Sequence, residues 1–172
     1  MTQGEFQKLL TTMKSLYSQP TFIPDENAME LWFDLLKDLD YEQANKALMN
    51  HMATSKFPPM PADIREKAAE YVTSDYMTPL EAWGLAYKAV GNSIYNSKEE
   101  FEKLPPIIQK VVGNHETLRE WAMMDINDVQ TVEQSHFIRS YREECEKDKK
   151  VQAMPENLRR LAAETAGRLS GE

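Results

Sequence analysis

The sequence of 172 residues contains a single cysteine, Cys145, and has no long apolar run. One cysteine cannot form a disulfide within the chain, which fits a reducing cytoplasm. No apolar stretch approaches the ~18 residues that a membrane span needs. The polar N-terminus also lacks the apolar core of a signal peptide. These absences predict a soluble protein of the cytoplasm with no membrane partner.

Glycine is also scarce, and the six glycines are scattered along the chain. A phosphate-binding loop needs a glycine-rich run ending in Gly-Lys-Ser/Thr, because backbone N–H groups must approach the phosphates closely. No such run is present. His51, His115 and His136 lie far apart and share no metal-ligand spacing with Cys145. The glutamates beside Cys145 disfavour a reactive thiolate. We therefore expect no catalytic residues, no metal, no cofactor and no enzymatic activity.

Basic residues are fewer than acidic ones, 20 against 28, so the formal net charge is −8. A global negative field opposes binding to nucleic acid. Residues 146–172 are the exception, with six basic and five acidic side chains. Five basic side chains, together with Tyr141, are the candidate contacts to single-stranded DNA. They are Arg139, Arg142, Lys147, Lys149 and Lys150. The alternative is a solvated helix end, so direct DNA contact is not our main expectation.

Apolar residues recur at helical spacing along most of the chain, and hardly any segment alternates as a strand does. Thr2 with Glu5 has the spacing of a capping box. The run Thr78-Pro79-Leu80-Glu81 combines a capping residue, proline at the first helical position and a glutamate two residues later. Gly91 predicts the end of the helix that starts there. The pattern predicts an all-α protein with short connections.

The predicted starts and ends of these helices divide the chain into three parts. Residues 1–75 are expected to form a small N-terminal four-helix domain, and residues 76–150 a second helical region. Residues 151–172 are expected to form an amphipathic C-terminal tail that is either mobile or docked. Trp32, Trp83 and Trp121 lie on apolar stripes, so we place them in cores.

A proline-rich loop between two predicted helices is the first candidate contact surface. It presents Lys56, Phe57 and Met60 among three prolines, which fix φ and reduce the entropy lost on binding. Phe57 and Met60 would supply apolar anchors. The alternative is that Phe57 packs into the helical core and the prolines only join two helices.

The C-terminal tail is the second candidate contact surface. Leu158 and Leu161 have helical spacing, and Arg159 and Arg160 lie between them. Such an amphipathic segment can place its apolar face in a groove on a partner. The alternative is a helix packed on this protein's own body, or a frayed chain end.

The order of these features is similar to that of a known family. The run LWFDLLKDLDYEQANKAL, followed by TSKFPPMPADI, resembles the N-terminal domain of the phage helicase loader and inhibitor family. The resemblance covers about residues 2–72. The later run YNSKEEFEKLPPIIQKVVG, with LREWAMMD and HFIRSYRE, resembles an extension carried by longer phage replication proteins.

The resemblance implies a function by contact. Family members bind the phage's hexameric DnaB-type replicative helicase and work with an origin-binding replisome organiser, in the host cell cytoplasm. It also implies that a mobile C-terminal segment helps to grip the helicase, a role that we transfer to Leu158, Arg159, Arg160 and Leu161. Two alternatives stay open: a nucleic-acid-binding accessory protein of phage replication, and an acidic inhibitor of a host factor.

Overall fold

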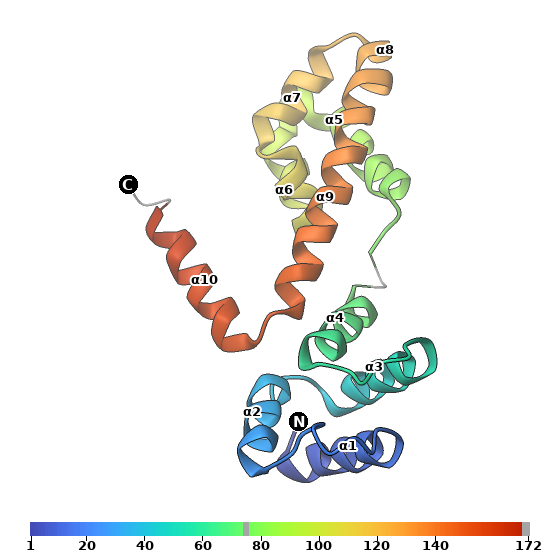
Figure 1. The fold of residues 1–172 in the computed structure, drawn as a ribbon. Helices are drawn as coiled ribbons and strands as arrows, with labels where there is room; N and C mark the ends of the chain where they lie inside the picture. The colour runs from blue at the N-terminus through green and yellow to red at the C-terminus, as the bar shows by residue number, and fades with distance from the viewer. Residues whose placement is uncertain (74–75, 170–172) are drawn as a thin grey trace. The chain divides into compact units, whose positions relative to one another are not determined.

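A computed structural model describes residues 1–73 and 76–169, with side chains as far as residue 165 (Figure 1). The described residues form helices and turns with no strand, which confirms the all-α prediction. The chain divides into two compact units. The N-terminal unit comprises Met1–Asp75 together with Lys149–Glu172, and the central unit comprises Tyr76–Asp148. No helix within the described ranges is long and apolar enough to cross a membrane.

Four helices build the body of the N-terminal unit: α1 (Gln3–Leu16), α2 (Glu26–Leu36), α3 (Tyr41–Thr54) and α4 (Pro61–Val72). Thr2 and Glu5 form the predicted capping box at the start of α1. The carboxylates of Asp25 and Asp40 accept first-turn N–H groups of α2 and α3. These caps satisfy backbone donors that have no partner inside the helix.

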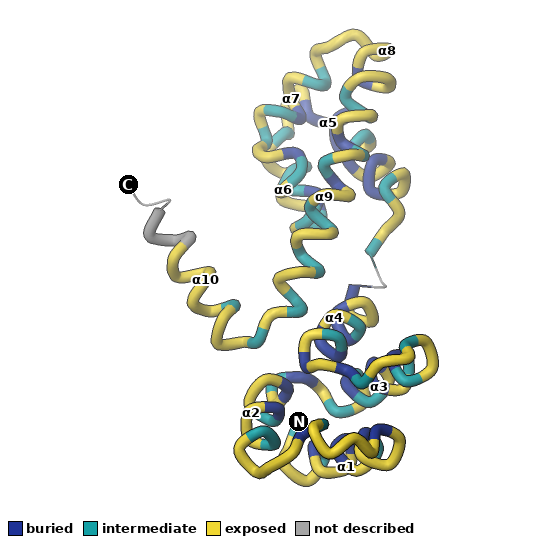
Figure 2. The backbone as a smooth tube through the Cα atoms, viewed as in Figure 1, coloured by how far each residue is buried: buried dark blue, intermediate teal, exposed yellow. Residues whose placement is uncertain are grey.

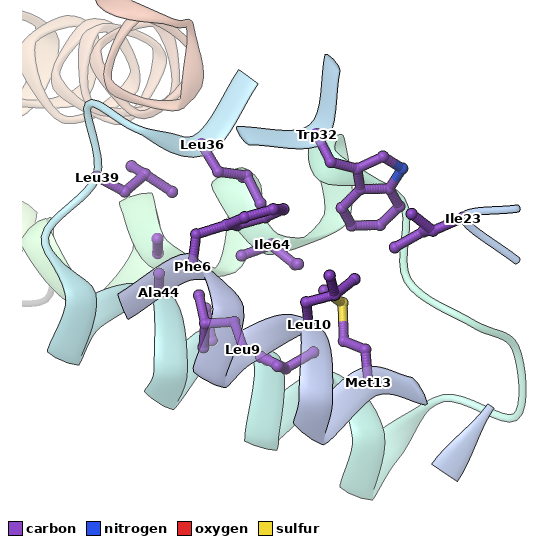
Figure 3. Close-up of a cluster of buried hydrophobic side chains, with 13 residues drawn as sticks. Phe6, Leu9, Leu10, Met13, Ile23, Trp32, Leu36, Leu39, Ala44 and Ile64 are labelled. Carbon is purple, nitrogen blue, oxygen red and sulfur yellow. The ribbon is translucent and has the colours of Figure 1, made fainter. Parts of the chain in front are cut away.

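The apolar stripes of these helices meet in one core (Figure 3). Leu9, Leu36 and Ile64 come from three different helices and are each 0% exposed. Burying an aliphatic side chain of this size contributes about 1.5–3 kcal/mol. Trp32 is buried as expected and packs edge-on against Phe22, with the ring centroids 5.8 Å apart. Hydrophobic packing therefore holds the four helices together.

Two further segments belong to the N-terminal unit although they lie at the far end of the chain. They are the last residues of α9 (Gln134–Ala153), from Lys149 on, and the helix α10 (Glu156–Leu169). From residue 156 to 165 every residue of α10 except Arg159 is exposed, as Figure 2 shows by the yellow of this helix. Helix α10 therefore has little packing of its own in the described residues.

The central unit has a separate core. Its elements are α5 (Pro79–Glu102), α6 (Pro106–Val112), α7 (His115–Met123), α8 (Ile126–Asp128), the π-helical turn η1 (Val129–Glu133) and the first part of α9. Trp83 lies at the centre and contacts the rings of Tyr87, Trp121 and Phe137, at centroid distances of 5.8, 5.9 and 5.4 Å. Trp83 is buried and Trp121 is half-buried against this core, which confirms their predicted placement.

The predicted end of a helix at Gly91 is wrong, because the helix continues through this residue as far as a kink at Asn96, beyond which a second helical stretch runs to Glu102. Val90 and Ser93 on either side are buried, and the Ser93 hydroxyl donates to the Ala89 carbonyl oxygen at 2.7 Å. Packing of these neighbours outweighs the low helix propensity of glycine. The helix departs from helical geometry only at Asn96, with φ −120° and ψ 29°.

Candidate partner-binding surfaces

The loop between α3 and α4 is held in one conformation by polar contacts around Phe57. The Phe57 N–H donates to Ser55 Oγ at 3.2 Å, and Ser55 Oγ in turn donates to the Phe57 carbonyl oxygen at 3.3 Å. The same carbonyl accepts a hydrogen bond from His51 Nε2 at 3.0 Å. His51 is itself only 6% exposed. The buried side chain of His51 therefore fixes the backbone of the loop at Phe57.

This fixed backbone turns the apolar side chains of the loop outward. Phe57 is 75% exposed and Met60 is 61% exposed, while Lys56 is exposed beside them. Pro59 of the loop and Pro61, the first residue of α4, are buried. The alternative in which Phe57 packs into the core is therefore wrong. The prolines occupy that space, and the two large side chains remain available to a partner.

The C-terminal helix presents a second exposed surface. Leu158 and Leu161 are 49% and 59% exposed. The side chain of Arg160 is 80% exposed and lies 3.9 Å from the carboxylate of Glu164. Arg159 differs, because it donates to Gln152 Oε1 at 3.1 Å and lies 3.5 Å from Asp38. Arg160 and the two leucines therefore face solvent, whereas Arg159 is engaged within the N-terminal unit.

At the N-terminal end of α10 lies a buried ion pair that the sequence did not predict. Arg65 of α4 is 4% exposed and makes a two-point contact with Asp38, at 2.6 Å to Oδ1 and 2.9 Å to Oδ2. Arg65 also donates to the carbonyl oxygens of Ala153 and Met154. No local signal could have found this contact, since the partners lie 27 to 89 residues away and α4 looks like an ordinary amphipathic helix.

The electrostatics of Asp38 follow from these contacts. Burial by itself would raise the pKa of the Asp38 carboxyl, because the charged form loses hydration. The hydrogen bonds and the charge of Arg65, together with the N–H of Glu156, outweigh burial and lower the pKa. Asp38 is therefore ionised at neutral pH, as a partner of a buried guanidinium must be.

The side chains proposed for DNA contact are divided between the two units. Arg139, Arg142 and Lys147 belong to the central unit, and Lys149 and Lys150 to the N-terminal unit. Lys147 is paired with Glu144 at 2.5 Å, and this carboxylate raises the pKa of the lysine. Acidic side chains thus compete for at least part of this positive charge, and DNA contact stays a prediction.

The described residues contain no group of three His, Cys, Asp or Glu side chains that could hold a metal ion. The central unit does have an apolar hollow, lined by residues of α5, α7 and the segment that follows α7. Its lining includes Tyr87, Ile94, Trp121, Met124 and Ile126. Its lining suits apolar contact rather than acid–base chemistry.

Comparison with known proteins relates the N-terminal region to a family. Residues 1–65 match the family model for the N-terminal domain of the phage helicase loader and inhibitor gp39P. This is the family that the sequence resembles, so the predicted family is confirmed for the N-terminal region. The match covers α1 to α3, the Phe57 loop and the start of α4. It ends before the central unit, so the resemblance of that unit to a replication-protein extension stays a prediction. Neither curated proteins nor solved structures gave a match.

Proposed function

We propose that this chain is a non-enzymatic adaptor of phage DNA replication. It binds a hexameric DnaB-type helicase, restrains its activity and delivers it to an origin-bound initiator. The observation that carries this proposal is the match of residues 1–65 to the N-terminal domain of the loader and inhibitor family. The two exposed surfaces on the N-terminal unit support it, because an adaptor needs contact surfaces rather than a catalytic centre.

The proposed mechanism is thermodynamic. An adaptor that binds one state of the helicase more tightly than another shifts the helicase toward that state, and its release reverses the shift. The net charge of −8 suits this role, since an acidic body does not compete for DNA and is attracted to a basic DNA-handling partner. Leu158, Leu161 and Arg160 are the proposed helicase contacts on α10. Lys56, Phe57 and Met60 form the proposed second contact.

The test is size-exclusion chromatography with light scattering, using the full chain, its cognate helicase and a slowly hydrolysed ATP analogue. We expect a defined complex with the full chain and a much weaker one with a chain that ends at Met154. This truncated chain keeps the Ala153 and Met154 carbonyl groups that Arg65 binds, so circular dichroism should show an unchanged N-terminal core.

A matched pair of variants separates the contact from general loss of apolar surface. Leu158→Ala with Leu161→Ala should weaken the complex, whereas Leu31→Ala with Leu80→Ala should not. All four leucines are between 49% and 64% exposed. If the truncated chain binds as tightly as the full chain, the tail has no part in the mechanism. If the full chain forms no complex, the proposed function fails, and the salt dependence of DNA binding becomes the next measurement.

A further inference from the structure

Every N–H group of the Arg65 guanidinium has a partner. Nε donates to the Ala153 carbonyl oxygen at 2.6 Å. Nη1 donates to the Leu35 carbonyl oxygen at 2.7 Å and to Asp38 at 2.6 Å. Nη2 donates to Asp38 at 2.9 Å and to the Met154 carbonyl oxygen at 2.7 Å. A guanidinium has five donors in a rigid fork, and all five are used here.

Asp38 binds both Arg65 and the start of α10. Its Oδ2 accepts the backbone N–H of Glu156, the first residue of α10, at 3.0 Å. First-turn N–H groups have no partner inside a helix, and a carboxylate at this end is favoured by the helix dipole. Asp38 therefore caps α10 from the turn after α2, 118 residues away in sequence.

We propose that Arg65 and Asp38 are positioning residues, which fix the direction of α10 on the N-terminal unit and so present its exposed face to a partner as a preset arm. We call this contact the latch; it consists of Arg65, Asp38 and the backbone of Ala153, Met154 and Glu156. The part of this inference that concerns the partner rests on the proposed function. The resemblance implied a mobile tail, whereas the latch joins the base of the tail to α4 and to the turn after α2.

The exposure of α10 indicates whether opening the latch should weaken or tighten the binding of a partner. Leu158 and Leu161 are 49% and 59% exposed while the latch is closed, and the Arg160 side chain is 80% exposed. A partner can therefore reach this face without opening the latch. The matching surface is an apolar groove with an acidic edge opposite Arg160. A closed latch avoids the cost of ordering the arm on binding.

Opening the latch should then weaken binding without removing any contact. If only a tenth of the molecules hold α10 in the competent direction, the apparent affinity falls about tenfold. A latch that blocked the partner would have the opposite effect, since opening it would tighten binding.

The first experiment measures the latch without any partner. Spin labels are placed in the full chain at Glu30→Cys on α2 and Ala163→Cys on α10, in a Cys145→Ser background. Pulsed electron resonance should give one narrow distance distribution. Asp38→Asn and Arg65→Lys should broaden it, because the first removes the charge and the second offers only three donors. Asp34→Asn is the matched control, since Asp34 lies four residues before Asp38, on α2, and pairs with Lys37 at the surface.

A milder variant covers the case in which these substitutions disturb folding. Glu156→Pro removes the N–H that Asp38 accepts, together with an exposed side chain, at a helix position that tolerates proline. It should broaden the distribution less than Asp38→Asn does. A broad distribution in the unaltered chain, or an unchanged one in both Asp38→Asn and Glu156→Pro, would overturn the proposal whatever the helicase does.

The second experiment measures helicase affinity with the same variants. We expect Asp38→Asn to bind about tenfold more weakly and Asp34→Asn to bind as the unaltered chain does. Tighter binding would show that the latch holds α10 back, and equal affinity with a broadened distribution would show that direction does not matter. Either result overturns the positioning role. If the unaltered chain fails to bind, the proposed function is wrong, while the spin-label distances still decide whether the latch exists.

Discussion

Phe57→Ala tests whether the α3–α4 loop serves contact or stability. Phe57 is 75% exposed, so only about a quarter of its surface is buried. An aromatic side chain buries ~200 Å² when it is fully enclosed. A quarter of that area, at ~25 cal/mol per Å², corresponds to about 1 kcal/mol. We therefore expect Phe57→Ala to lower the free energy of unfolding by about 1 kcal/mol or less.

Phe6→Ala is the matched control, because it removes the same ring from a position that is 2% exposed in the core. This change leaves a cavity and should cost about 3–5 kcal/mol. Urea unfolding followed by circular dichroism and tryptophan fluorescence measures both variants. The two substitutions remove the same ring, so the difference between them reports chiefly how far each ring is buried.

The functional measurement is the affinity for the helicase or for the origin-binding partner. If Phe57 is an apolar anchor, its truncation should cost about 2 kcal/mol or more, roughly thirtyfold in affinity. A loss of more than about 2 kcal/mol of unfolding free energy for Phe57→Ala would refute the reasoning, because the exposed position cannot supply it. Unchanged affinity for both partners would remove Phe57 from the contact surface.

Two further predictions concern the central unit. Burial, helped by the nearby Cys145 thiol, raises the pKa of Tyr141 from 10.0 to about 12. The folded state therefore favours the neutral phenol, whose hydroxyl donates to the Met77 carbonyl oxygen at 3.2 Å. This contribution is complete below about pH 10 and is lost as the pH rises toward about 12. The unfolding free energies of the native chain and Tyr141→Phe should thus converge between about pH 10 and about pH 12, and a constant difference would contradict this. Leu118→Ala, at a position 0% exposed, should cost about 2–5 kcal/mol. Because Leu118 lies in the core of the central unit alone, amide exchange in α1 to α4 should not change; faster exchange there would contradict separate cores.

The sequence predicted those features that depend on residues close together along the chain. The capping boxes of Thr2 with Glu5 and Thr78 with Glu81 are both present, because a cap involves residues only three positions apart. The tryptophans on apolar stripes also lie where helical spacing predicts. The resemblance to the loader family, carried by 1–65, needs no structure either.

The sequence did not decide how Phe57 is placed, since an aromatic residue in a short loop can be packed or exposed. The decision depends on His51 and Ser55, which bind the Phe57 backbone, and on Pro59, which occupies the interior instead. The continuation of α5 past Gly91 has a similar origin, because neighbouring side chains are buried against other elements. Tertiary packing outweighs local propensity in both places.

Residue types and spacing thus determined the helices, their starts and the apolar faces that build two cores. Only the tertiary structure brought Arg65 and Asp38 to the base of α10, 88 to 118 residues away along the chain. An isolated arginine on an amphipathic helix gives no sign of its partners. The reason is physical: a buried guanidinium must find an acceptor for every donor, and distant backbone carbonyls supply those acceptors only once the chain has folded.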